Sequence, residues 1–258
     1  MRRILGAFAV ATFAITGFAA PAGAATTPKG CVLIAHRGDH ATYTENSIGA
    51  MRQAVADRAG DLETDIHASA DDHLFVMHDD TVDRTSNGTG SIADMTAAEI
   101  RALRLDDGER IPYFTGVLKV AVSSGTPILV EVKSVEDAQT YAHIVSAVDS
   151  VGAQHLVTFA SFHGTYLNRL RAIAPTIPEA IISDTALPAS TVQHFGGIEV
   201  SYQAVTDAWL SSLGDVPVYA WTPDTEAEWS ALMGRVTGVI TNNDQGFRAY
   251  VAEGCPVS

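Results

Sequence analysis

The sequence predicts an α/β fold, a TIM (β/α)8 barrel, from three observations. Short apolar runs recur along the chain with hydrophobic residues on both faces, as in parallel strands that are covered by helices. Segments with helical periodicity separate these runs, which indicates βαβ units and a parallel sheet. Eight of the runs begin at residues 31, 61, 127, 155, 179, 197, 216 and 236, and eight is the number of strands in such a barrel. An open doubly wound sheet is the alternative, although no glycine-rich GxGxxG motif follows the first run.

The first residues have the pattern of an export signal. A positive n-region at Arg2-Arg3 precedes the uncharged apolar residues 4–20, and Ala22-Gly23-Ala24 supplies the small residues that a signal peptidase reads. A transmembrane anchor is the competing interpretation, because the apolar run is near the lower length limit for spanning a bilayer. We predict that residues 1–24 are cleaved, that residues 25–258 form a single domain, and that the protein is secreted, either extracellular or periplasmic.

The first predicted units carry polar residues at the ends of their strands. Residues 31–35 form the first strand, which leads directly into His36, and the apolar residues of 45–58 recur on one face of a helix. The second strand, residues 60–66, is followed by a further extended run at residues 73–77.

The segment before the third barrel strand differs in character from the rest. It is polar and glycine-bearing at first, and it then contains a short predicted helix, residues 96–105, with Thr96 and Glu99 in a capping-box pattern. We expect residues 79–112, roughly, to form a small insertion over the mouth of the barrel after the second strand.

The remainder of the chain is rhythmic. Predicted helices follow or precede each later strand at residues 112–123, 135–151, up to 169, 189–195, 207–213 and 226–233, and residues 247–251 close the chain. Without its first 24 residues the 258-residue chain is near the lower end of the usual size of a TIM barrel.

The acidic composition excludes some classes of partner. The formal net charge is −14, with 16 basic and 30 acidic residues, and no basic stripe is present for nucleic acid or anionic lipid. Solubility explains much of such a charge, and an acidic cleft that holds a cation is a second explanation. We expect a small-molecule substrate, no nucleic acid, no stable membrane anchor and a monomer.

The two cysteines lie at opposite ends of the predicted mature chain. Cys31 immediately precedes the first strand, and Cys255 lies three residues from the carboxyl terminus. In an exported protein an even number of cysteines favours a disulfide, and a closed ring would bring the two termini together. We predict a Cys31–Cys255 disulfide, with two free buried thiols as the alternative.

Carboxylates occur at alternate positions on two predicted strands. Glu63 and Asp65 project to one face of the second strand, and Glu131 and Lys133 do the same on the third. In a barrel that face is the interior, where unpaired charges are costly, and a divalent cation with oxygen ligands, Ca²⁺ or Mg²⁺, would neutralise them. The alternative is a set of ion pairs with Arg37 or Lys133, although buried ion pairs contribute little stability.

Two histidines are candidates for acid–base catalysis. His36 and His78 each follow an apolar run, and imidazole can act as general acid and general base near neutral pH. Arg37 offers a planar fork and Lys133 an ammonium for phosphate oxygens. Trp221, near a strand end, is a candidate for the wall beside the substrate, with a core position as its alternative. A serine or cysteine nucleophile is not supported, because no GxSxG motif occurs and both cysteines are at the extremities.

Several ordered motifs together resemble the glycerophosphodiester phosphodiesterase family, in its secreted bacterial form. The matching elements are His36-Arg37-Gly38, Glu45-Asn46-Ser47, Glu63-x-Asp65, Val76-Met77-His78-Asp79, the stretch from Asp83 to Gly90, Glu131-Val132-Lys133 and Ala220-Trp221-Thr222.

The resemblance implies a TIM barrel that hydrolyses glycerophosphodiesters, such as glycerophosphocholine or glycerophosphoethanolamine, to glycerol 3-phosphate and an alcohol. It implies one Ca²⁺ or Mg²⁺ ion at Glu63, Asp65 and Glu131. His36 and His78 would form the acid–base pair, with the acid unassigned, and Arg37 and Lys133 would lie near the phosphate. Water or a glycerol hydroxyl would be the attacking group.

This sequence departs from the family pattern at a few positions. Ser47 stands where threonine is common, Asp72 stands where glycine is frequent, and residues 241–244 replace a commoner Thr-Asp-x-Pro. The rival functions are a secreted phospholipase D-like enzyme acting on lysophospholipid or sphingomyelin, and a non-catalytic binding protein on the same barrel.

Overall fold

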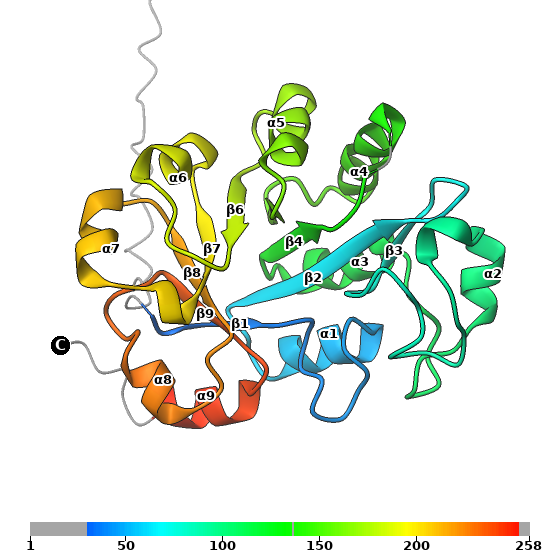
Figure 1. Ribbon diagram of the computed structural model, residues 1–258. Coiled ribbons are helices and arrows are strands. Elements are labelled where there is room, and N and C mark those ends of the chain that lie inside the picture. Colours follow the sequence, from blue (N-terminus) through cyan, green and yellow to red (C-terminus); the bar gives the residue numbers. More distant parts are fainter. Residues whose placement is uncertain (1–29, 136, 253–258) are drawn as a thin grey trace, which may run out of the picture.

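The computed structural model describes residues 30–135 and 137–252, which form a closed parallel barrel (Figure 1). Each barrel strand pairs in parallel with its neighbours, and β1 pairs with both β2 and β9, which closes the ring. The closed ring confirms the predicted TIM barrel, and the open doubly wound sheet is wrong. The barrel strands are β1 (Val32–Ala35), β2 (Asp61–Ala68), β4 (Ile128–Val132), β5 (Val157–Ser161), β6 (Glu179–Ser183), β7 (Ile198–Ser201), β8 (Val218–Trp221) and β9 (Gly238–Thr241).

Helices surround the strands as an outer layer. They are α1 (Ile48–Ala56), α3 (Phe114–Ser124), α4 (Ala138–Ser150), α5 (Gly164–Ile173), α6 (Ala189–Phe195), α7 (Asp207–Leu213), α8 (Glu226–Ser230) and α9 (Asp244–Ala252). Several begin at a side-chain cap, since Ser47, Thr206 and Thr225 accept hydrogen bonds from the first turns of α1, α7 and α8. The predicted helices are present, and α6 and α7 have the predicted bounds.

The core divides into an outer and an inner part. The larger apolar cluster fills the space between strands and helices and includes Leu62 and Ile66 of β2. A small cluster of Ile34, Leu129 and Ile240 comes from the opposite faces of β1, β4 and β9 and closes the barrel interior. Side chains two positions further along the same inward faces reach the carboxyl end of the barrel, where polar residues begin.

The segment between β2 and β4 extends the barrel on one side. The short strand β3 (Leu74–Val76) runs antiparallel to the end of β2. The chain then passes through the 3₁₀ turn η1 (Ile92–Asp94) and α2 (Ala97–Ala102), whose Thr96–Glu99 capping box is as predicted. A separate apolar cluster that includes Phe75, Ile92 and Ile100 holds this segment together. Figure 1 shows it beyond the carboxyl end of β2.

Two predictions concern residues outside those that the structure describes. The predicted signal peptide, residues 1–24, lies outside them, and so does Cys255, so that the Cys31–Cys255 disulfide stays a prediction. Among the described residues, no helix combines the length and the apolar character needed to cross a bilayer.

Candidate active site

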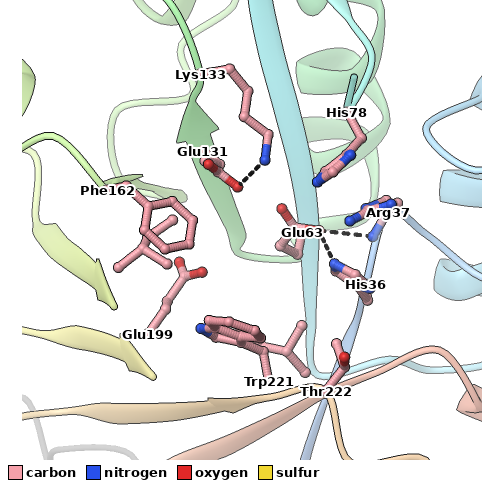
Figure 2. Close-up of a pocket in the computed structure, with 12 residues that line it drawn as sticks. His36, Arg37, Glu63, His78, Glu131, Lys133, Phe162, Glu199, Trp221 and Thr222 are labelled. Atoms are coloured by element: carbon pink, nitrogen blue, oxygen red, sulfur yellow. Dashed lines mark hydrogen bonds and ion pairs between the residues drawn. The ribbon is translucent and has the colours of Figure 1, made fainter. Parts of the chain in front are cut away.

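A pocket opens at the carboxyl ends of the barrel strands (Figure 2). Seven of the eight predicted catalytic, substrate-binding and metal-binding residues line it, and the eighth, Asp65, contacts Arg37 and Lys133 of its wall. The lining residues are His36, Arg37, Glu63, His78, Glu131, Lys133, Phe162, Ile182, Glu199, Trp221, Thr222 and Ile240.

Three buried carboxylates meet on one side of the pocket. Asp65 and Glu131 are register partners on β2 and β4, and Glu63 precedes Asp65 by two positions on the same face. Their exposed fractions are 3% for Glu63, 1% for Asp65 and 9% for Glu131. One oxygen from each lies within 4.8 Å of the others. The alternation seen in the sequence therefore brings the three side chains together as predicted.

Two basic side chains contact this cluster. Lys133 Nζ lies 2.7 Å from Glu131 Oε2 and 3.2 Å from Asp65 Oδ1, and Arg37 Nε lies 3.5 Å from Asp65 Oδ2. The ion pairs expected as the alternative to a metal site are thus present. Burial alone would raise the pKa of Asp65, but the charges of Lys133 and Arg37 hold it below its usual value.

The positive charges of Lys133 and Arg37 do not neutralise the negative charges of all three carboxylates. Burial, followed by repulsion from Asp65, raises the pKa of Glu63 well above its usual value, and the same causes raise the pKa of Glu131 to about 7. Among the described residues, Asp65 Oδ1 has its ion pair with Lys133 Nζ but no hydrogen bond. Three converging carboxylate oxygens with excess negative charge fit a hard divalent cation such as Ca²⁺ or Mg²⁺.

The loop from β1 to α1 orients the carboxylates through unusual backbone conformations. Arg37 and Asn46 have φ values of 59° and 61°, in the left-handed region. The Arg37 amide donates to Glu63 Oε2 at 2.9 Å. The Asn46 side chain donates to Asp65 Oδ2 at 2.8 Å and accepts from Thr64 Oγ1 at 2.9 Å. Glycine is required at position 38, because a Cβ there would lie 2.6 Å from the carbonyl carbon of Ala50.

His36 is held by an amide. Its Nδ1 lies 2.6 Å from Asn242 Oδ1, and Asn242 Nδ2 donates to Asp224 Oδ2 at 2.8 Å. The other ring nitrogen of His36 lies 4.0 Å from Glu63 Oε2, on the pocket side. Burial, followed by the charge of Arg37, lowers the pKa of His36 to about 4, so the ring is neutral at pH 7.

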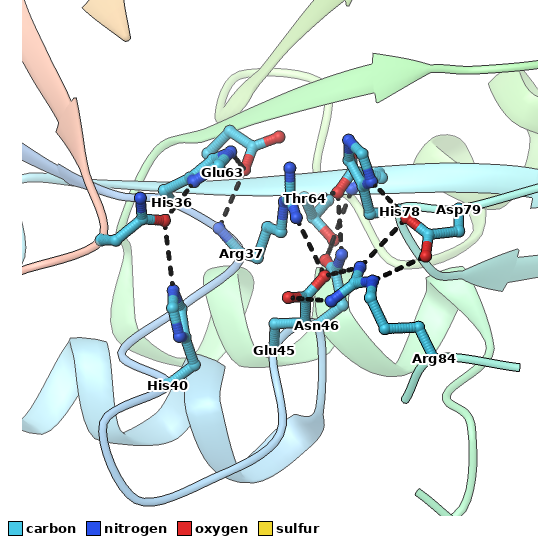
Figure 3. A network of polar contacts seen from close by, with 12 residues as sticks. His36, Arg37, His40, Glu45, Asn46, Glu63, Thr64, His78, Asp79 and Arg84 are labelled. Atoms are coloured by element: carbon cyan, nitrogen blue, oxygen red, sulfur yellow. Dashed lines mark hydrogen bonds and ion pairs between the residues drawn. The ribbon is translucent and has the colours of Figure 1, made fainter. Parts of the chain in front are cut away.

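His78 is held by a carboxylate instead (Figure 3). Its Nδ1 lies 2.7 Å from Asp79 Oδ1, and Asp79 Oδ2 accepts from Arg84 Nε at 2.6 Å. Arg84 also donates twice to Glu45, at 2.8 and 2.7 Å, and Arg37 donates to the same carboxylate at 3.0 Å. This network joins the loop after β3 to the loop after β1.

Aromatic residues form the opposite wall of the pocket. Phe162 and Trp221 contact each other edge to face, with ring centroids 6.3 Å apart. Trp221 therefore lines the pocket and also packs against the inner apolar cluster, and its contact with substrate stays a prediction. Glu199 of β7 lies between the two rings and is 4% exposed (Figure 2).

The pattern of motifs on this barrel matches a known family. The sequence model of the glycerophosphoryl diester phosphodiesterase family matches residues 36–244. A glycerophosphodiester phosphodiesterase of Caldanaerobacter subterraneus is 31% identical over 239 residues, which cover 86% of this chain and 98% of the relative. The chain belongs to this family. A putative glycerophosphodiester phosphodiesterase of Bacillus subtilis is 28% identical over 81% of this chain and 93% of its own.

Solved structures share the fold of this family member. A phosphodiesterase of Oleispira antarctica, in complex with the product sn-glycerol-3-phosphate, aligns with a TM-score of 0.80 at 22% identity, over 85% of this chain and 96% of the other. A glycerophosphodiester phosphodiesterase of Agrobacterium tumefaciens aligns with a TM-score of 0.73 at 24% identity, over 84% and 98%. The chain is thus a glycerophosphodiester phosphodiesterase, an enzyme of the class that hydrolyses phosphoric diesters.

Several site residues of this phosphodiesterase had no role in the sequence interpretation. Asn46, Asp79 and Arg84 belong to motifs that the sequence shares with the family. Their importance could therefore be recognised from the sequence, but the residues that they contact could not. Asn242 lay in the departure at residues 241–244, which marked that side of the pocket as unusual. Glu199 was a carboxylate at an inward position of an apolar strand, the same signal that identified Glu63.

Proposed function

We propose that this protein is a secreted, Ca²⁺- or Mg²⁺-dependent hydrolase of glycerophosphodiesters, such as glycerophosphocholine, which uses His36 and His78 as its acid–base pair. One observation carries the proposal: two histidines with different Nδ1 partners face the same pocket as three clustered carboxylates. The resulting products would be glycerol 3-phosphate and an alcohol, and the first of these is the product bound to the Oleispira antarctica phosphodiesterase.

The hydrogen bonds of His36 suit a general base. The carboxylate of Asp224 can only accept, so the amide nitrogen of Asn242 faces Asp224 and its oxygen faces His36. The proton of the neutral ring is then on Nδ1, which leaves a lone pair on Nε2 at the pocket. Nε2 would take the proton of the attacking hydroxyl, from water or from the glycerol of the substrate.

The hydrogen bonds of His78 suit a general acid. Asp79 places a negative charge against Nδ1, and Arg84 holds that carboxylate in position. A ring supported in this way can carry a second proton and deliver it from Nε2 to the leaving alkoxide. Arg37 and Lys133, at the rim of the carboxylate cluster, would contact the phosphate oxygens.

Glu63, Asp65 and Glu131 would hold the cation. When bound, a divalent cation there polarises a phosphoryl oxygen and neutralises the negative charge that develops on it. Both histidines line the same pocket as these carboxylates, so a cation held there would lie beside the acid–base pair and would help to orient the phosphate.

Activity measurements test this function. Release of glycerol 3-phosphate from glycerophosphocholine and glycerophosphoethanolamine should require Ca²⁺ or Mg²⁺ and stop in a chelator. Lysophosphatidylcholine, assayed in parallel, distinguishes this function from the phospholipase alternative, which would cleave it. We expect His36→Ala and His78→Ala each to lower kcat by about 10²–10⁴-fold, whereas His73→Ala, at an exposed histidine outside the pocket, leaves it unchanged. Full activity in a chelator, or in either catalytic variant, would refute the assignment.

Export and the disulfide have their own test. The support for export is the charged n-region, apolar run and small residues of positions 1–24. Intact mass of the protein from culture medium or periplasm should correspond to a chain that begins at Ala25. A mass lower by two hydrogens than that of the reduced chain would support the Cys31–Cys255 bridge, and a retained Met1 would contradict cleavage.

A further inference from the structure

Two polar atoms without hydrogen-bond partners lie on the aromatic side of the active-site pocket. Glu199 Oε1 and Trp221 Nε1 are both buried, and neither has a partner among the described residues. They come from adjacent strands, because β7 pairs with β8 in a register that places Glu199 beside Tyr219 and Ser201 beside Trp221. Figure 2 shows the Glu199 carboxylate pointing toward the space between Phe162 and Trp221.

The fold does not account for Glu199. Its side chain is 4% exposed, its Oε1 has no hydrogen-bond partner among the described residues, and it is not a member of the three-carboxylate cluster. Burial, followed by repulsion from Glu131 and Asp65, raises the pKa of Glu199 well above its usual value. A buried carboxyl group in this state destabilises the protein, so a ligand is the explanation that gives it a partner.

The two atoms match a hydroxyl group in their hydrogen-bonding character. The carboxyl oxygen accepts a hydrogen bond and the indole N–H donates one, and a hydroxyl can do both at once. The quaternary ammonium of choline has no lone pair for the indole N–H. The rings of Phe162 and Trp221 offer an apolar surface for a short carbon chain beside these atoms.

The polar side chains on the other side of the pocket are those that the proposed function assigns to the phosphate and its reaction. His36, His78, Arg37 and Lys133 lie with the carboxylate cluster on the other side of the pocket. We infer that Glu199 and Trp221 Nε1 bind the hydroxyl groups of the glycerol moiety and thereby select glycerophosphodiesters over diesters without a polyol arm. This inference rests on the proposed function and names the part of the substrate that the site recognises.

Binding measurements test the inference without catalysis. With Ca²⁺ and Mg²⁺ present, isothermal titration calorimetry compares sn-glycerol 3-phosphate with propyl phosphate, which has the same phosphate and chain length but no hydroxyls. We expect the wild-type protein to prefer glycerol 3-phosphate by about tenfold or more, because the two hydrogen bonds are lost with propyl phosphate. Phosphocholine serves as the head-group probe and should bind no better than propyl phosphate.

Substitutions in the pocket test which residues cause the preference for glycerol 3-phosphate over propyl phosphate. Glu199→Leu and Trp221→Phe should each bring the ratio of the two affinities close to one, and Glu199→Gln should keep part of it, because the amide oxygen still accepts. Phe162→Leu is the matched control in the same wall. It removes no polar atom, so it should weaken both ligands together and leave their ratio unchanged. Circular dichroism establishes that each variant is folded, and Glu199→Gln and Trp221→Phe carry the test if Glu199→Leu is not.

Several outcomes would overturn the inference. These are equal wild-type affinities for the two phosphates, a preference that survives Glu199→Leu and Trp221→Phe, and a preference for phosphocholine. One further result would distinguish a failure of the proposed function from a failure of this inference. If glycerol 3-phosphate is preferred through Glu199 but no phosphodiester is cleaved, the hydroxyl subsite stands and the proposed activity fails.

Discussion

The two histidines proposed as the acid–base pair differ in the residues that hold them. His36 is hydrogen-bonded to the neutral amide of Asn242, whereas His78 is hydrogen-bonded to the charged carboxylate of Asp79. Burial and the charge of Arg37 outweigh the hydrogen bond of Asn242 and lower the pKa of His36, whereas Asp79 places a full negative charge 2.7 Å from His78 Nδ1. This difference is the basis for assigning the base and the acid.

Substitution of Asn242 tests this assignment. In Asn242→Asp a carboxylate replaces the amide beside His36 Nδ1, so the pKa of His36 rises from about 4 and the acidic limb of the profile of kcat/KM against pH moves to higher pH. Asn242→Ala removes the acceptor, and we expect it to lower kcat by about 10–100-fold with little change in the position of that limb. An unchanged pH profile in Asn242→Asp would show that Asn242 does not position the base.

At the scale of single elements, the first turn of α9 sets two electrostatic effects against each other. Asp244 begins this helix, where the helix dipole favours a negative charge by about 0.3–1 kcal/mol. The side chain is only 3% exposed, however, and both carboxylate oxygens lack hydrogen-bond partners among the described residues. Burial, followed by repulsion from Asp39, raises the pKa of Asp244 to about 8, so burial outweighs the dipole.

Replacing Asp244 should therefore stabilise the protein in a pH-dependent way. The folded state retains the proton of Asp244 up to about pH 8, whereas the unfolded chain loses it near its usual pKa, so this group makes stability fall as pH rises between the two values. Asp244→Asn removes that dependence. The gain in unfolding free energy at pH 7 should exceed the gain at pH 5 by roughly 2–3 kcal/mol.

Guanidinium unfolding at the two pH values measures this difference. Asp94→Asn, the same substitution at an exposed side chain, is the control. Equal gains at pH 5 and pH 7 in Asp244→Asn would contradict the prediction.

Strand periodicity predicted those site residues that share a strand. The inward positions of β2 and β4 follow from alternation, so Glu63, Asp65 and Glu131 could be placed on one axis before the fold was known. The start of α1 could not be predicted so closely. The helix was expected from residue 45 and begins at Ile48, because Glu45 and Asn46 are held by Arg37, Arg84 and Asp65 instead.

At the scale of the whole molecule, closure of the barrel joins residues that are far apart in sequence. His36 and Asn242 are 206 positions apart, and they meet because β1 pairs with β9. The repeating pattern of strands and helices predicted the ring, but it carries no information on which loop side chains meet across the closure. The contact between His36 and Asn242, and the hydroxyl-binding role inferred for Glu199, therefore required the three-dimensional arrangement.

The net charge of −14 and the buried carboxylate cluster together link cation binding to pH. Without a cation, the raised pKa values of Glu131, about 7, and of Glu63 mean that the folded state holds more protons than the unfolded chain. This contribution makes stability fall as pH rises from the usual glutamate pKa through pH 7. A cation binds the deprotonated carboxylates and competes with these protons.

Stabilisation by Ca²⁺ or Mg²⁺ should therefore be larger at pH 8 than at pH 5.5. At about 100 times Kd the gain is about 2.7 kcal/mol, or roughly 5–10 °C in Tm for a protein of this size, when the carboxylates are ionised. Differential scanning fluorimetry of chelator-treated protein measures the shift at both pH values. KCl at matched ionic strength separates binding of the cation at the site from screening of the general negative charge.

Variants test whether the cation binds at the three carboxylates. Glu131→Gln should abolish the difference in stabilisation between divalent and monovalent salt, whereas Glu226→Gln, at an exposed position, should retain it. A shift that KCl reproduces, or one that survives Glu131→Gln, would place the cation elsewhere than at the three carboxylates.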